Sequence, residues 1–109
     1  MSWSDKQLDW ELNSQSLTIL LAEASRGSMS EFSHYQIIRW LGRFADDVTP
    51  INEQTRCLTN MCDDATVVWE LFVSSHYTLE QLQKFSLNDV ILPKEHFAQW
   101  HQKTMDLLT

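Results

Sequence analysis

Only two glycines and two prolines occur among the 109 residues of the chain, and this scarcity narrows its possible folds more than any other feature. An all-β domain needs turn-forming residues about every 8–12 positions, so this scarcity argues against an all-β fold. It also excludes a glycine-rich phosphate-binding loop. Hydrophobic residues make up 43% of the chain and charged residues 21%, which is the composition of a folded protein. A chain of this length supports one core and therefore one domain.

The chain is acidic, with 15 Asp and Glu against 8 Lys and Arg and a formal net charge of −7. The acidic excess is spread evenly along the sequence, so no charged tail is expected. Such a protein repels phosphate backbones and anionic lipids at long range. We therefore expect no direct binding to nucleic acid and no membrane partner.

Three features of the sequence predict a cytoplasmic protein. The first residues, MSWSDKQLDWEL, carry charges where a secretory signal needs an apolar stretch. The longest apolar run, Ile19 to Ala22, is far shorter than the ~18 residues of a membrane span. Cys57 and Cys62 would point about 140° apart on a shared helix, so we expect free thiols, which suit a reducing compartment.

The first predicted helix begins where Ser4 and Gln7 have the spacing of a capping box, and it ends at Gly27. It is either continuous over residues 5–25 or broken within residues 13–16. Both readings remain open at the level of the sequence.

Ser28 and Glu31 also have capping-box spacing and predict a second helix that runs to about Ala45. This helix is the most clearly amphipathic segment of the chain. Its predicted core face consists of Ile37, Ile38, Trp40, Leu41, Phe44 and Ala45.

A third helix is predicted to begin with Thr49 as N-cap and Pro50 at the first helical position, and to end at Asp63 and Asp64. Its apolar stripe comprises Ile51, Thr55, Leu58, Met61 and Cys62. Residues 65–73 follow, rich in β-branched and aromatic side chains that favour a strand. We predict a helix instead, because no second strand exists to pair with it. Being apolar on nearly every side, it should be the most buried helix.

Thr78 and Gln81 predict a short helix that ends near Phe85, and Pro93 begins the last helix after a connector. The core face of that last helix consists of Phe97, Trp100, Thr104, Leu107 and Leu108. The expected fold class is therefore all-α, a single compact orthogonal bundle of about five to seven helices.

No metal-binding pattern occurs among the histidines, which are His34, His76, His96 and His101. None of them has the i,i+3 or i,i+4 spacing that zinc sites on helices use, and no C-x-x-C motif is present. We expect no metal site. His34 falls within the apolar arc of the second helix, and we interpret it as a core-edge histidine whose ring meets a backbone carbonyl or water.

No arrangement in the sequence matches an enzyme active site. Cys57 and Cys62 are predicted to be packed mid-helix, and the hydroxyl residues at helix starts are explained as caps. The pairs Asp46-Asp47 and Asp63-Asp64 are placed at helix junctions, where carboxylates cap the next helix. We therefore expect a protein that is not an enzyme and has no cofactor, although a site assembled only in an oligomer is a weaker alternative.

Five tryptophans stand out: Trp3, Trp10, Trp40, Trp69 and Trp100. The last three occupy apolar faces and are predicted to be core. Trp3 and Trp10 lie in the polar N-terminal segment. If that segment is one helix, it has a second apolar face consisting of Trp10, Leu17, Leu20, Leu21 and Ala24, opposite Leu8, Leu12, Ile19 and Ala22.

The candidate partner-binding residues are accordingly Trp3, Trp10, Leu17 and Leu21. The partner is another protein, and a second copy forming a homodimer would be the most economical one. If the helix is broken, both faces instead pack on one core.

The function expected from the sequence is that of a non-enzymatic cytoplasmic protein-binding module, a regulator, inhibitor or adaptor. The alternative is an acidic component of a nucleic-acid system, either a mimic that blocks a basic site or a transcription-complex subunit that reads no bases. Mimicry would make binding fall steeply with salt.

Overall fold

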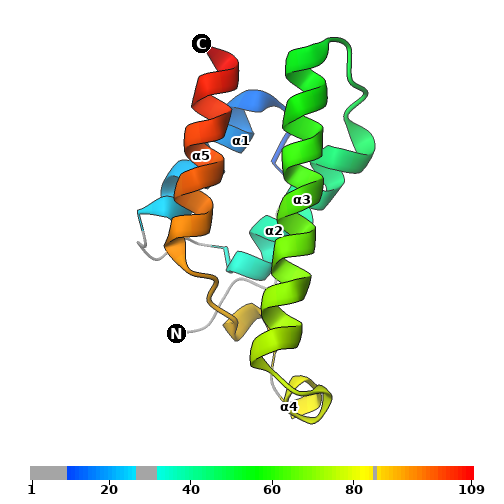
Figure 1. Ribbon diagram of the computed structural model, residues 1–109, viewed down its shortest axis with the longest axis vertical. Helices are drawn as coiled ribbons and strands as arrows, with labels where there is room; N and C mark the ends of the chain where they lie inside the picture. Colours follow the sequence, from blue (N-terminus) through cyan, green and yellow to red (C-terminus); the bar gives the residue numbers. More distant parts are fainter. Residues whose placement is uncertain (1–9, 27–31, 85) are drawn as a thin grey trace.

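Five α-helices and one 3₁₀ turn form the secondary structure of the residues that the structure describes, which are 10–26, 32–84 and 86–109. In this computed structural model the elements are α1 (Ser14–Ser25), α2 (His34–Asp47), α3 (Glu53–His76), α4 (Leu79–Lys84), η1 (Leu87–Asp89) and α5 (Lys94–Leu108) (Figure 1). No strand occurs in these residues. The prediction of an all-α fold is confirmed.

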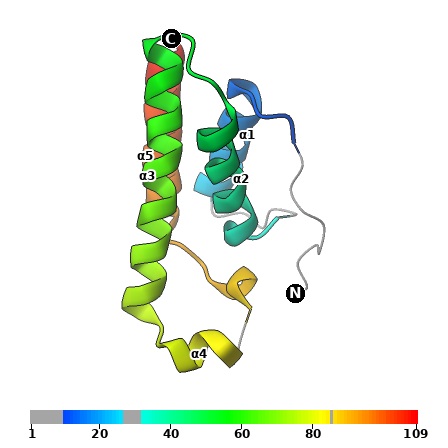
Figure 2. The same ribbon diagram turned by 90° about the vertical axis from the view of Figure 1, so that its right-hand side faces the viewer.

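The helices form two layers in a single globule of 43 × 24 × 24 Å. The long helices α3 and α5 run antiparallel in one layer, with α1 and α2 in the other (Figures 1 and 2). The closest packing is between α2 and α3 and between α1 and α5. The predicted orthogonal arrangement is therefore wrong for α3 and α5.

The core lies between the layers, and every helix except α4 contributes to it. Its largest fully buried side chains include Trp40, Phe44, Phe97, Leu17, Leu20, Leu21, Ile37 and Leu41. Thr104 is also fully buried, and its hydroxyl donates to the carbonyl oxygen of Trp100 at 2.8 Å. The predicted core location of Trp40, Trp69 and Trp100 is confirmed.

Helix α1 begins at Ser14 because the side chain of Asn13 accepts the backbone N–H of Ser16 at 2.8 Å. Residues 10–12 are not helical, so the continuous reading of the first helix is wrong and a start at the suspected break is correct. The predicted capping box of Ser4 and Gln7 lies outside the described residues.

The face of α1 that packs on the core consists of Leu17, Leu20, Leu21 and Ala24. This is the face that was expected, from the sequence, to bind a partner protein. Ile19, on the opposite face, is 41% exposed. Because α1 is one short helix, one face is enough to hold it on α5, and the other meets solvent.

Helix α2 is capped by Ser33 and Gln36, and its N-cap lies five residues later than predicted. The Ser33 hydroxyl accepts the Gln36 N–H at 3.1 Å, and the Gln36 side chain accepts the Ser33 N–H at 2.8 Å. The predicted cap residues Ser28 and Glu31 lie outside the described residues. The predicted core face of α2 is confirmed for Ile37, Ile38, Trp40, Leu41 and Phe44.

Helix α3 is capped by Asn52, whose side chain accepts the backbone N–H of Thr55 at 2.8 Å. The predicted cap at Thr49 is wrong, and Ile51, expected to be in the buried stripe, is 83% exposed before the helix begins. Asp63 and Asp64 do not end the helix, since it continues to His76 with both side chains exposed.

Residues 65–73 are helical despite their β propensity, as predicted. They are not the most buried segment, however. Val67 and Leu71 are 47% and 61% exposed, because they point away from the layer formed by α1 and α2. Among the helices that the structure describes, none has the length and apolar character needed to cross a membrane.

Helix α4 has the predicted capping box. The Thr78 hydroxyl accepts the Gln81 N–H at 3.1 Å, and the Gln81 side chain accepts the Thr78 N–H at 2.9 Å. Phe85, its predicted end, lies outside the described residues. Helix α5 follows Pro93, as expected from the sequence.

Candidate functional site

An apolar groove lies between α2 and α3, with α4 and η1 at one end. It has a volume of about 430 Å³ and an open mouth. Its apolar lining consists of Tyr35 and Ile38 from α2, Trp69 and Val73 from α3, Leu82 from α4 and Leu87 from η1. We call this cavity the α2–α3 groove.

Helical spacing brings these side chains together. Tyr35, Ile38 and Gly42 share one face of α2 at i, i+3 and i+7, and the facing positions on α3 are Trp69 and Val73. Gly42 also lines the groove, and a Cβ atom there would lie 3.4 Å from the side chain of Thr66 on α3, which is an ordinary van der Waals contact.

An aromatic stack closes one side of the groove. The rings of Tyr35 and Trp69 lie 5.9 Å apart and nearly parallel, and the Arg39 guanidinium lies 5.6 Å above the Tyr35 ring. Arg39 on the α2 wall and Glu70 on the α3 wall are both exposed. The groove therefore has an apolar floor and one charge of each sign at its rim.

Two side chains at the start of α2 hold the connector that carries Leu87. The Ser33 hydroxyl donates to Asn88 Oδ1 at 2.6 Å, and the backbone N–H of Leu92 donates to His34 Nδ1 at 2.9 Å. The expected carbonyl or water partner is wrong for Nδ1, because this nitrogen accepts a backbone N–H. Nδ1 must therefore be unprotonated, which assigns the ring proton to Nε2.

Burial lowers the pKa of His34 from its ordinary value of 6.5, and its ring packs edge-on against Phe97 with centroids 4.7 Å apart. The unfolded chain thus binds a proton at a higher pH than the folded chain does. We predict that the free energy of unfolding falls as the pH drops below about 6.5, because protonation costs the bond to Leu92.

Urea unfolding between neutral and mildly acidic pH tests this prediction. The change His34→Gln keeps an acceptor for Leu92 without a titrating group, so it should flatten the decline in stability. The change His101→Gln serves as the matched control and should leave the decline as it is in the wild type. An equally steep decline in the His34→Gln variant would contradict the assignment.

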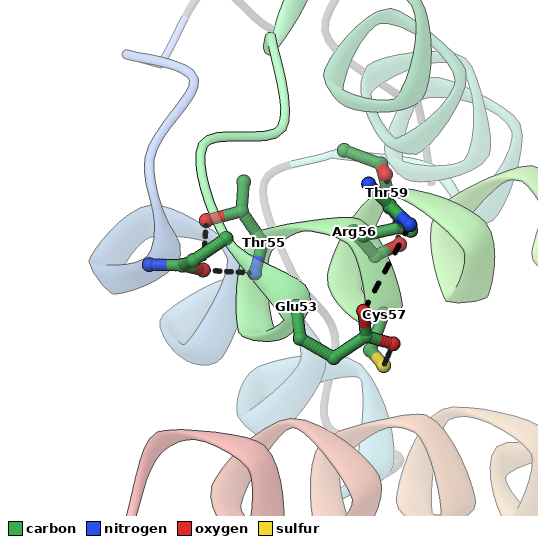
Figure 3. Close-up of polar contacts among 6 residues, drawn as sticks. Glu53, Thr55, Arg56, Cys57 and Thr59 are labelled. Carbon is green, nitrogen blue, oxygen red and sulfur yellow. Dashed lines mark hydrogen bonds and ion pairs between the residues drawn. The ribbon is translucent and has the colours of Figure 1, made fainter.

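The two cysteines are free, as predicted, and neither has the surroundings of a nucleophile. Cys57 is half-buried near the start of α3, where its thiol contacts Glu53 Oε1 at 3.7 Å and Arg56 lies 3.9 Å from the same carboxylate (Figure 3). Burial raises the pKa of Cys62 to about 12, which keeps this thiol protonated.

The polar clusters singled out in the sequence are dispersed on the surface. Asp46 and Asp47 end α2 and are exposed, and the exposed pair Asp63 and Asp64 lies within α3, so the predicted placement of that second pair at a junction is wrong. Within residues 10–26, 32–84 and 86–109, no group of three His, Cys, Asp or Glu side chains is placed to hold a metal ion.

Those partner-binding residues expected from the sequence that the structure describes do not form an exposed surface. Leu17 and Leu21 have no exposed area in the folded chain. Trp10 is half-buried, its carbonyl oxygen accepts the indole N–H of Trp40 at 2.9 Å, and its ring meets Phe32 edge-on with centroids 6.3 Å apart. Trp3 lies outside the described residues. A binding surface must therefore be sought elsewhere on the protein.

The groove was not predicted from the sequence, although one signal for it was present. Trp69 and Val73 were assigned to a helix that is apolar on nearly every side, and such a helix needs more cover than one core provides.

Comparisons with protein-family models, with curated proteins and with solved structures found no match.

Proposed function

We propose that this protein is a non-enzymatic protein-binding module that receives an apolar helical surface of its partner in the α2–α3 groove. One observation carries this proposal, namely the open apolar cavity of about 430 Å³ between the two helices. This volume is within the range of binding sites in proteins. An apolar groove with a polar rim is also the kind of surface into which amphipathic helices dock.

The dimensions of the groove suit a helix. The α2 wall runs from Tyr35 to Gly42, which is two helical turns or about 10 Å. A docked helix would place two apolar side chains, one turn apart, along that length. The rim charges of Arg39 and Glu70 would then orient the docked helix through its flanking residues.

The chemistry of the groove supports binding rather than catalysis. Its lining is mainly apolar, and its polar side chains come from Tyr35, Arg39, Thr66, Glu70 and Ser74. This set holds no imidazole or thiol to act as a base or nucleophile at neutral pH. We propose a role as regulator, inhibitor or adaptor, and we propose the cytoplasm as its location because the two thiols are free.

Affinity capture from the native host with groove variants tests the proposed function. The change Ser74→Phe should fill the groove from an exposed position, and Gln99→Phe on α5 is a matched control on another exposed helical face. We expect wild type and Gln99→Phe to capture the same protein and Ser74→Phe to lose it.

Capture that is unaffected by Ser74→Phe, or no captured protein at all, would contradict the proposed function. If the captured protein is insensitive to Ser74→Phe and its binding falls steeply with salt, the alternative of an acidic mimic is favoured. Circular dichroism of each variant establishes that the fold is retained.

A further inference from the structure

A second apolar surface lies beside the groove on the same helix. Val67 and Leu71 are 47% and 61% exposed and stand one turn apart on α3, and we call this pair the α3 ridge. Glu70, on the wall of the groove, lies about 80° around the helix from the ridge. The outer side of α3 is not covered by any other described helix (Figure 2).

We propose that the groove receives the α3 ridge of a second copy of this chain, in a two-fold symmetric dimer. This inference rests on the proposed function, since it names the partner for the same groove. The ridge and one wall of the groove belong to the same helix. A two-fold axis near α3 therefore allows each copy to insert its ridge into the groove of the other.

The chemistry of the two surfaces matches. The ridge presents two branched aliphatic side chains, and the groove offers an apolar floor formed by residues such as Ile38 and Val73. Both surfaces would lose contact with water in the dimer, which favours association. A symmetric contact of this kind is closed, so it produces dimers and not filaments.

Charge complementarity supports the same occupant. Arg39 and Glu70 flank the groove, and no ion pair joins them within the part of the chain that the structure describes. Glu70 directly precedes Leu71, so insertion of the ridge carries this carboxylate toward Arg39 of the second copy. The two-fold axis forms this contact twice.

The net charge of the chain has a separate effect on the dimer. Two chains of net charge −7 repel each other, so added salt should strengthen the dimer overall.

Sedimentation equilibrium of the full chain, from low to high micromolar concentration, tests the inference. We expect a dimer for the wild type and at least about 100-fold weaker association for Leu71→Asp, because the change places a charge in both contacts. The fold should survive, since Leu71 points away from the core. Leu71→Ser is a milder second variant that should weaken the dimer in the same direction. Ile51→Asp, at an 83% exposed position before α3, is the matched control and should remain dimeric.

A mixing experiment tests the symmetry directly. Ser74→Phe fills the groove and should also be monomeric alone, whereas its control Gln99→Phe should dimerise. A mixture of Leu71→Asp and Ser74→Phe chains retains one intact ridge and one intact groove that fit each other. The mixture should therefore associate more strongly than either variant alone.

Several outcomes would overturn the inference. They are a monomeric wild type at high micromolar concentration, a dimer that persists in Leu71→Asp, and a dimer that is indifferent to Ser74→Phe. These outcomes concern the dimer and do not by themselves overturn the proposed function. A monomeric wild type that still captures another protein in a Ser74-dependent manner overturns the dimer and supports the proposed function.

Discussion

Replacing Leu17 with Asp should leave a chain that does not fold. Leu17 is fully buried in α1, within the core cluster. An unpaired carboxylate in such a place costs about 4 kcal/mol or more, because it loses its hydration and gains no partner. A small domain is stable by only about 5–15 kcal/mol, so this one change removes much or all of that margin.

Circular dichroism and urea unfolding measure this effect, and Ile19→Asp is the matched control. Ile19 lies on the same helix but is 41% exposed, so its carboxylate keeps most of its hydration. The control should lose only a small part of its stability. A Leu17→Asp variant as stable as the control would show that Leu17 is accessible, and would restore the partner-binding surface expected from the sequence.

Replacing Trp69 with Ala should cost about 3–5 kcal/mol, the range for deleting a packed large aromatic side chain. Trp69 is 5% exposed and stacks on Tyr35, so its removal opens a cavity between α2 and α3. The groove would also lose its largest lining side chain. Binding through the groove should therefore be lost along with part of the free energy of unfolding.

The midpoint of urea unfolding tests this prediction, with Trp69→Phe as the conservative control. Phenylalanine retains a ring beside Tyr35 and should recover part of the lost stability. An unfolding midpoint for Trp69→Ala that equals the wild type would mean that this side chain is not packed in the core, and the described geometry of the groove would be wrong.

Local signals in the sequence predicted the helices well but not all of their ends. The cap at Thr78 and the helix after Pro93 follow from side-chain chemistry within a few residues. Ser33 with Gln36 has the same spacing as Ser28 with Glu31, and the pattern alone does not say which pair caps α2. Packing against Asn88 and the connector favours Ser33.

The continuity of α3 could have been predicted from spacing. Leu58, Cys62, Ala65 and Trp69 stand at i, i+4, i+7 and i+11, so one buried stripe runs past Asp63 and Asp64. Exposed aspartates inside a helix cost only a few tenths of a kcal/mol each, which the buried face readily outweighs. The prediction that Asp63 and Asp64 end the helix was therefore wrong.

The apolar character of residues 65–73 indicated that this helix needs extra cover, but neither the position of the groove nor the burial of Leu17 follows from the sequence pattern. Helical periodicity gave α1 two apolar faces, and only the placement of α5 decides which of them is buried. Tyr35, Trp69 and Leu87 come from three elements, and they meet because the connector is tied to the start of α2 through His34 and Ser33. Such tertiary contacts leave no local signature.

Site-specific photo-crosslinking in the native host shows whether a polypeptide occupies the α2–α3 groove. A benzophenone side chain at Leu82, at the end of the α2–α3 groove, should form adducts with a helical segment of a polypeptide. The same group at the exposed position Gln99 on α5 should form none, and adding Ser74→Phe should abolish the adducts from Leu82. Equal adducts from both positions, or none from Leu82, would contradict the assignment of the groove as a binding site.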